Sequence, residues 1–454
     1  MTKDLTEGSP VRLIVGFTVP LLIGNLFQQF YSMADTLIVG RTLGRNALAA
    51  VGCTGALSFL LLGFCMGLTS GFAVITAQRF GAGDEAGVRR SFSAGLLLTG
   101  IFSVVLTLVS VPVIGPVLRL IRTPEEIYID AFRYIVIVFA GLGAAMYFNF
   151  YSNIIRALGD SRTPLYLLAL ACLINIVLDF VLILFAGWGV SGAAVATVAA
   201  QAVAAVACRV YIRVRLPFLR PHRGERRPPL HILKQHLFLG FPMGFQMSVI
   251  AVGQVVLQFA LNGLGAVAVA AYSAAQKIDA LAIQPMMSFG ITMATYAAQN
   301  YGAGRIDRIR AGVNRCILVS GSFSVVIAVV NILAGRQLTA LFVGSGETEL
   351  IRLSWVYLVS NGIFYFLLAL LFIYRSTLQG LGDGITTTVA GVMELLMRMA
   401  AALVMAGLFG FLGASLSNPM AWAGALLPLM ISYYRLIGKL SKQSGGNGKK
   451  GNCV

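Results

Sequence analysis

The chain contains an internal repeat with a period of about 221 residues. Four pairs of short matches keep this spacing to within about two residues, an agreement that chance rarely produces. A duplicated backbone plan is therefore the first constraint on the fold, and we expect two similar halves. The matched pairs are 78–83 (Gln-Arg-Phe-Gly-Ala-Gly) with 299–304 (Gln-Asn-Tyr-Gly-Ala-Gly), Leu-Gly-Asp at 158–160 with 381–383, Leu-Gly at 43–44 with 264–265, and Pro20 with Pro242.

The halves are too apolar for a soluble protein. Hydrophobic residues make up 58% of the chain and charged residues 11%, whereas soluble domains carry roughly 25% charged residues. The mean hydropathy is +0.84. Apolar runs are about 20 residues long and do not alternate with polar residues, which favours membrane-spanning helices over a β-barrel. The sequence therefore predicts an all-α polytopic membrane protein.

Twelve apolar segments can be marked, six in each half. Because six is an even number, both halves enter the membrane from the same side, which makes them parallel repeats with a central cavity expected between two six-helix lobes. Secondary transporters commonly have this plan. We expect an N-terminal lobe at 1–213, a cytoplasmic linker at 214–231, a C-terminal lobe at 232–438 and a disordered basic tail at 439–454.

The basic residues behind the net charge of +17 are distributed as the predicted topology requires. Most of the 34 lysines and arginines lie at the N-terminus, in the loops after even-numbered helices and in the tail. The positive-inside rule therefore places both termini in the cytoplasm of a multi-pass protein of the plasma (inner) membrane. The charge indicates contact with the lipid bilayer and argues against nucleic acid as a partner. Asp4, Glu7 and the lack of a cleavage site indicate that the first helix is retained.

Four polar residues of the first half lie within apolar segments. Asp35 is in the first segment, Asn175 and Asp179 share one face of the fifth, and Thr197 is in the sixth. An aspartate in hydrocarbon costs at least roughly 2.5–3.5 kcal/mol, so each needs a reason. Counting residues from the outer turns puts Asp179 and Thr197 about 12 Å below the outer surface, with Asp35 at a similar depth. The sequence thus permits one polar cluster in the outer half of the N-terminal lobe.

Such a cluster has the chemistry of an ion-coupling site. Two carboxylates in a low dielectric cannot readily both be ionised, so the pair can exchange a proton, or together hold a cation such as Na+. The alternative is that Asp35 is interfacial and Asp179 a hydrogen-bonded structural acid. Pro20, within the first helix, removes one backbone hydrogen bond and permits a kink, or else a static bend.

The second half carries a different set of charges. Lys277 and Asp279 lie in the eighth helix, where a substrate or ion role and a structural role are both open. Glu394 and Arg398 are an i,i+4 pair of opposite charge, for which a structural ion pair is the favoured interpretation.

Further residues are candidates for a substrate cavity. Aromatic and methionine surfaces suit flat apolar cations, although most such residues in a membrane protein face lipid or neighbouring helices. Gln254 and Gln258 lie near the position where the repeat would place a counterpart of Asp35. The full candidate set is Tyr31, Gln254, Gln258, Lys277, Asp279 and Met286.

Motifs for other functions are missing from the sequence. No Walker-A phosphate loop, zinc-binding His-Glu-x-x-His or Gly-x-Ser-x-Gly elbow occurs, so the chain is not its own ATPase and no enzyme is indicated. The cysteines suggest neither disulfides nor a metal cluster. We expect no cofactor beyond a coupling ion, and small-molecule substrates that are cationic and amphipathic.

Taken together, these residues resemble the multidrug and toxic compound extrusion (MATE) family. The resemblance covers nearly the whole chain and rests on twelve helices in two lobes, Pro20 followed by Met-Ala-Asp-Thr at 33–36, the paired Gly-Ala-Gly turns and the paired Leu-Gly-Asp motifs. The Asn-x-x-x-Asp pattern ending at Asp179, with Asp35 and Thr197, is similar to the DinF-like branch. There these positions form a network in the N-terminal lobe, and Pro20 corresponds to the helix-kink site.

The resemblance implies an antiporter that exports drugs or organic cations in exchange for protons or sodium by alternating access, and we expect it to act as a monomer. The acids of the NorM-like branch are missing: position 250 is Ile250, and 355–374 contains no acid. A NorM-type sodium site is therefore not expected, although sodium at Asp35 and Asp179 stays open. The alternative function is a lipid-linked precursor flippase of related architecture, which would use a basic cavity around Lys277 and Arg398.

Overall fold

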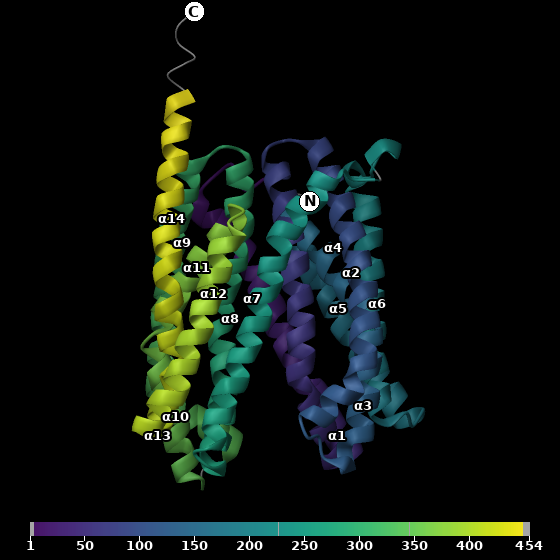
Figure 1. The fold of residues 1–454 in the computed structure, drawn as a ribbon, viewed down its shortest axis with the longest axis vertical. Helices are drawn as coiled ribbons and strands as arrows, with labels where there is room; N and C mark the ends of the chain where they lie inside the picture. Colours follow the sequence, from purple (N-terminus) through teal and green to yellow (C-terminus); the bar gives the residue numbers. More distant parts are fainter. Residues whose placement is uncertain (1–3, 226, 345, 448–454) are drawn as a thin grey trace, which may run out of the picture. The chain divides into compact units, whose positions relative to one another are not determined.

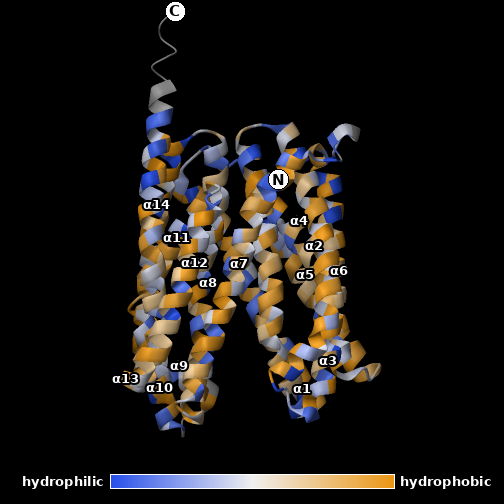
Figure 2. Ribbon diagram, in the orientation of Figure 1, coloured by the Kyte–Doolittle hydropathy of each residue, from blue (hydrophilic) through white to orange (hydrophobic). Residues whose placement is uncertain are grey.

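The computed structural model describes residues 4–225, 227–344 and 346–447, and within these ranges it contains helices and no strands. Nine helices are long and apolar enough to cross a membrane, and two bent helix pairs bring the number to eleven. The first of these helices has non-helical backbone at Gly44 and so consists of two arms. The twelve predicted spans are thereby accounted for. Figure 2 shows hydrophobic residues along the helices and hydrophilic residues gathered toward their ends.

The elements of the first half follow the expected order (Figure 1). They are α1 (Pro10–Gly81), α2 (Glu85–Leu120), α3 (Glu125–Ala140), α4 (Leu142–Ala157), α5 (Arg162–Asp179), the π-helix η1 (Phe180–Phe185), α6 (Gly189–Arg215) and two short 3-10 turns, η2 (Pro217–Leu219) and η3 (Arg223–Glu225). In this half, α3 and α4 form one bent span, with an angle of 46° between them.

The second half repeats this order. Its elements are α7 (Leu230–Asn262), α8 (Ala266–Gly302), α9 (Ile306–Val343), α10 (Thr348–Gly362), α11 (Tyr365–Gly380), α12 (Gly384–Ala400), the π-helix η4 (Ala401–Met405), α13 (Ala406–Ser415) and α14 (Ser417–Asn447). The bend between α10 and α11 is 49°, close to that between α3 and α4. The tail expected to be disordered is helical in its described part, because α14 continues through 439–447; residues 448–454 lie outside the described ranges.

The repeated sequence motifs mark turns that require glycine. Within each pair the two glycines adopt nearly the same left-handed backbone, a region that disfavours residues with a Cβ. The repeat in the sequence is therefore a repeat of turn geometry between helices. The φ angles are 85° and 95° at Gly44 and Gly265, 69° and 70° at Gly83 and Gly304, and 86° and 89° at Gly159 and Gly382.

The aspartate of each Leu-Gly-Asp motif fastens the turn. Asp160 Oδ1 accepts hydrogen bonds from the backbone of α5, and its Oδ2 accepts one from the hydroxyl of Tyr211 on α6 at 3.0 Å. Asp383 does the same in the second half, with Thr386 N at 3.0 Å and the hydroxyl of Ser432 at 3.1 Å. Burial disfavours ionisation of Asp160, but these hydrogen bonds outweigh it and hold the pKa of its carboxyl below the ordinary value.

The chain forms two compact units whose bounds differ from the predicted lobes. Unit 1 contains Ile23–Gly244 and unit 2 contains Leu5–Leu22 with the chain from Phe245 onward. The first part of α1 thus belongs to unit 2, and the first part of α7 to unit 1. The segment 214–231 lies within unit 1 and is not the boundary between units.

Glycine packing explains why the start of α7 belongs to unit 1. A Cβ added at Gly67 of α1 would lie 2.3 Å from the carbonyl oxygen of Met243, and one at Gly71 would lie 2.6 Å from the Cα of Gly240. Small residues allow such close helix approach within a membrane. Buried His236 adds a hydrogen bond of 3.0 Å with Ser91 of α2.

Polar contacts hold the start of the chain in unit 2. The backbone N–H of Leu5 donates to Gln299 Oε1 at 2.9 Å, and Asn300 Nδ2 donates to the carbonyl of Leu5 at 3.2 Å. Farther along α1, the hydroxyls of Thr18 and Thr292 are 2.8 Å apart. Sequence alone did not show these contacts, because they join residues almost 300 positions apart.

We expect Gly159→Ala to lower the free energy of unfolding by about 1–2 kcal/mol, because alanine is strained in the left-handed region. The matched control is Gly52→Ala, at a helical position of α1 where an added Cβ meets nothing within 4 Å. That change should be neutral or slightly stabilising. Thermal melting of the purified protein in detergent measures both, and equal effects would contradict the turn argument.

Candidate ion-coupling site

Unit 1 brings the predicted acids together. Asp35 of α1 and Asp179, the last residue of α5, are neighbours whose carboxyl groups interact electrostatically. Asp179 is fully buried and Asp35 half-buried. The π-helix η1 begins directly after Asp179, and π segments often occur at functional positions of helices.

Three of the four carboxyl oxygens of this pair lack a hydrogen-bond donor in the part of the chain that the structure describes. Both oxygens of Asp179, and Oδ1 of Asp35, are buried without a hydrogen-bond partner among the donor groups of the described residues. If both neighbouring carboxyl groups were ionised, they would repel each other in a low dielectric. A proton shared between them, or a bound cation, removes that repulsion and satisfies the oxygens.

Asn175, one turn before Asp179 on α5, contacts Thr197 of α6. Asn175 Nδ2 donates to Thr197 Oγ1 at 3.4 Å, and the Thr197 hydroxyl donates to the carbonyl of Ala193 at 3.1 Å. The side chain of Tyr31 is within hydrogen-bonding reach of Thr197 and interacts electrostatically with both acids. Tyr31, expected to line a substrate cavity, is therefore next to the carboxyl pair.

Tyr134 of α3 is a neighbour that the sequence did not single out. Its hydroxyl interacts electrostatically with both Asp35 and Asp179. The internal repeat could have pointed to Tyr134, because this residue lies about 223 residues before Tyr357, a tyrosine that contacts an acid in unit 2.

In unit 2, Asp279 is buried and fully provided with donors. The hydroxyls of Tyr357 and Tyr365 both donate to its carboxylate, the former at 3.2 Å. Asn418 and Asn331 in turn donate to these two hydroxyls, at 3.1 Å and 3.0 Å. Unlike the pair in unit 1, Asp279 is therefore held by a fixed set of hydrogen bonds.

The other candidate residues of the second half do not form a common site with Asp279. Lys277 is exposed although it is only two residues away, and Met286 is fully buried in the apolar core of unit 2. Gln254 accepts a hydrogen bond of 3.1 Å from the Tyr272 hydroxyl, whereas Gln258 donates to Asn262 at 2.8 Å. The structure thus does not assemble the six candidates into one site.

Glu394 and Arg398 form the expected contact, with a third partner. Arg398 Nη2 is 2.9 Å from Glu394 Oε1, and Arg375 Nη2 of α11 is 2.5 Å from Glu394 Oε2. All three side chains are at least nine-tenths buried. The sequence missed Arg375 because its partner is 19 residues away on another helix.

No group of three or more His, Cys, Asp or Glu side chains suited to a metal ion occurs in the described ranges. The carboxyl pair of unit 1 offers two acidic side chains, with Asn175 and Thr197 as neutral oxygen donors nearby. This set fits a proton directly, and sodium only with those neutral oxygens added.

The fold defines a polytopic membrane protein built from two similar helical repeats. The sequence model of the family described as MatE matches this chain twice, at 20–181 and 242–404. The chain belongs to the MATE family. The two matches begin at Pro20 and Pro242, which confirms the internal repeat.

Two curated relatives come from Bacillus subtilis. The probable multidrug resistance protein YoeA is 30% identical, covering 97% of this chain and 96% of the relative. The probable multidrug resistance protein YpnP is 31% identical over 67% of this chain and 68% of its own length. A solved structure titled as the outward-facing conformation of a multidrug resistance MATE family transporter has a TM-score of 0.90, at 23% identity, with 96% and 98% of the two chains covered. The family resemblance is thus confirmed, and its members are transporters rather than enzymes.

Replacing Glu394 by glutamine should destabilise the protein by about 3–5 kcal/mol, because two buried guanidinium groups lose their counter-charge. The control is Glu349→Gln, which breaks an exposed pair with Arg352 at 2.7 Å and should leave the melting temperature unchanged. Melting curves in detergent compare the two variants. A stable Glu394→Gln protein would mean that the arginines are neutralised in another way.

Proposed function

We propose that this chain is a secondary active antiporter that exports drugs or organic cations in exchange for protons, with Asp35 and Asp179 as the coupling site. The observation that carries the proposal is the pair of neighbouring carboxyl groups, with Asp179 fully buried and without a hydrogen-bond donor among the described residues. A proton bound between them neutralises the pair, and its release leaves repelling charges. Such a difference between the two protonation states is what couples ion movement to a conformational change.

The names of the relatives support drugs as substrates, since both Bacillus subtilis proteins are described as probable multidrug resistance proteins. Sodium is the second candidate for the coupling ion, with Asn175 and Thr197 completing the oxygen ligands. We place the protein in the plasma membrane with both termini in the cytoplasm, because most loop arginines and lysines lie on that side.

A lipid-linked precursor flippase receives less support. Arg398 is paired with Glu394, and Lys277 is exposed rather than part of a buried basic site. Lipid flipping in liposomes without efflux of cations would nevertheless favour it over the antiporter.

Asp35→Asn and Asp179→Asn should each insert normally and lose gradient-driven efflux, because an amide cannot take up and release the proton. The measurement is efflux of a fluorescent organic cation from proteoliposomes, first under an imposed pH gradient and then under a sodium gradient. Asp307→Asn, an exposed acid in the first turn of α9, is the matched control and should keep full efflux. Full pH-driven efflux by both site variants would overturn the proposal, and efflux driven only by sodium would change the coupling ion.

The helix at Pro20 is continuous in this structure, with its single described break at Gly44, so a kink at Pro20 stays a prediction. Pro20 and its repeat partner Pro242 each lie two residues before the chain passes from one unit to the other. We expect Pro20→Ala to slow efflux more than it lowers the melting temperature, since the change restores a backbone hydrogen bond at that point. Transport rate and melting of the same preparation test this, and unchanged transport would assign Pro20 a static role.

A further inference from the structure

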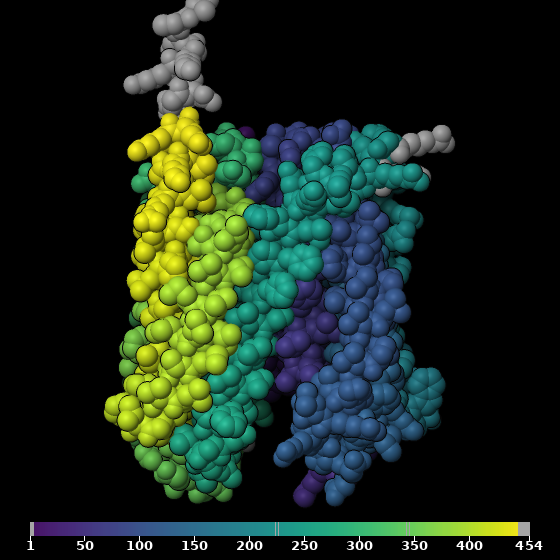
Figure 3. Space-filling model, viewed as in Figure 1, coloured from purple at the N-terminus to yellow at the C-terminus, as the bar shows by residue number. Residues whose placement is uncertain are grey.

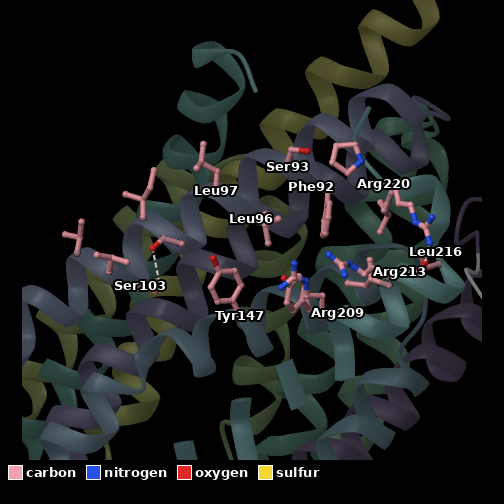
Figure 4. Close-up of a pocket in the computed structure, with 18 residues that line it drawn as sticks. Phe92, Ser93, Leu96, Leu97, Ser103, Tyr147, Arg209, Arg213, Leu216 and Arg220 are labelled. Atoms are coloured by element: carbon pink, nitrogen blue, oxygen red, sulfur yellow. Dashed lines mark hydrogen bonds between the residues drawn. The ribbon is translucent and has the colours of Figure 1, made fainter. Parts of the chain in front are cut away.

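A groove on unit 1 has no part in the coupling site. Its volume is about 1320 Å³, and it lies between α2, α4, α6 and the η2 turn that follows α6. Figure 4 shows Arg209 and Arg213 of α6 lining it together with Tyr147 of α4 and Phe92 of α2. Figure 3 shows α2, coloured blue, at the surface of unit 1.

One end of the groove is strongly basic. Arg209, Arg213 and Arg220 line it, all three are exposed, and no acidic residue is among the lining side chains. Within 4–225, 227–344 and 346–447, none of these guanidinium groups has a carboxylate within 4.0 Å. Arginine stays protonated at all relevant pH values, so three positive charges stand together without compensation.

The basic end is also shaped by local contacts. Arg220 Nη2 donates to the backbone carbonyl of Arg213 at 2.9 Å, which holds Arg220 beside the end of α6. The rings of Tyr147 and Tyr151 stack with centroids 5.9 Å apart. A Cβ at Gly100 would lie 2.7 Å from the Tyr147 hydroxyl oxygen, so glycine at this position lets the tyrosine pack against α2.

The rest of the groove is an apolar stripe along α2. From Phe92 to Val105 the lining residues recur at helical spacing, and the stripe is about 20 Å long. This length is comparable to one leaflet, which is half of the roughly 30 Å hydrocarbon core. Its outer members are exposed large aliphatic side chains, namely Leu97, Ile101, Val104 and Val105.

We propose that this groove binds an anionic membrane phospholipid, with the phosphate at Arg209, Arg213 and Arg220 and an acyl chain along α2. The positive-inside rule places the basic end at the cytoplasmic surface, where lipid phosphates lie. Arginine forks bind phosphate in bidentate geometry, and tyrosines favour the boundary between head groups and acyl chains. Charge and apolar length thus match the two parts of one molecule.

A lipid explains the groove better than a soluble anion does. A free phosphate would use the three arginines but would leave the long aliphatic stripe without a function. A neutral lipid would use the stripe but would leave three charges uncompensated. The proposal does not depend on the transported substrate, because none of these residues belongs to the carboxyl site.

The test measures lipid binding to the delipidated full-length protein by native mass spectrometry. Phosphatidylglycerol is the probe, and phosphatidylcholine with the same acyl chains is the neutral comparison. We expect clear preference for phosphatidylglycerol, and roughly 30-fold weaker binding by the double variant Arg209→Gln/Arg213→Gln, given about 1 kcal/mol for each arginine near an anionic lipid surface.

The matched control removes two charges elsewhere on unit 1. Arg162→Gln/Arg215→Gln changes exposed arginines that do not line the groove, and it should bind phosphatidylglycerol as the unchanged protein does. A second variant, Ile101→Trp, fills the apolar stripe and keeps every arginine. It should weaken lipid binding, and it decides the matter if the double arginine variant does not fold.

Three results would overturn the proposal. The first is equal binding of phosphatidylglycerol and phosphatidylcholine. The second is an equal loss of binding in the control double variant, which would indicate a general effect of charge. The third is full displacement of the lipid by millimolar glycerol phosphate with normal binding by Ile101→Trp, which would assign the groove to a soluble anion.

Discussion

Hydrocarbon offers no hydrogen-bond partners, so every polar group within the spans must find one inside the protein. The backbone meets this demand by forming helices across the spans, with turns between them. Buried acids of unit 2 meet it through fixed donors: two tyrosine hydroxyls for Asp279 and two guanidinium groups for Glu394. Asp179 of unit 1 is the exception. Asp179 is as deeply buried as either acid, yet its oxygens face another carboxyl group instead of a donor. Under the proposed coupling role a proton or cation would satisfy these oxygens, whereas neighbouring side chains satisfy Asp279 and Glu394.

The repeat made most of the fold predictable. Glycines at the turns need a left-handed backbone and so leave a visible pattern, and apolar runs of membrane length locate the spans. Asp35 and Asp179 could be brought to one depth by counting residues, because a helix rises by a constant amount per residue. Counting cannot give rotation about the helix axis. For that reason Lys277 and Met286 were grouped with Asp279, although one is exposed and the other lies in the apolar core. Counting along one helix also cannot find contacts with a neighbouring helix, such as those of Tyr134 and Arg375.

Symmetry and its absence have separate physical roles in this molecule. Turns, caps and π segments recur at equivalent positions in the two halves. In each half a side chain of the last helix also donates a hydrogen bond to the aspartate of the Leu-Gly-Asp turn, Tyr211 in the first half and Ser432 in the second. The buried charges do not obey it. The repeat offset places Asp179 opposite the alanines around Ala401 at the start of η4, and Asn175 opposite Arg398 or its neighbour. The repeated backbone thus gives two units with similar turns, while among the described residues the neighbouring carboxyl pair lies in unit 1.

The division of α1 and α7 between units has a consequence for the gene as well as for the protein. Unit 2 includes Leu5–Leu22, and unit 1 extends to Gly244, positions that correspond under the repeat. A cut within 214–231 would therefore produce two fragments, neither of which contains a whole unit. Each would lack the opening stretch of helix that the other fragment encodes. A single ancestral copy with the same plan could complete its fold only by exchanging that stretch with a second copy, as domain-swapped dimers do.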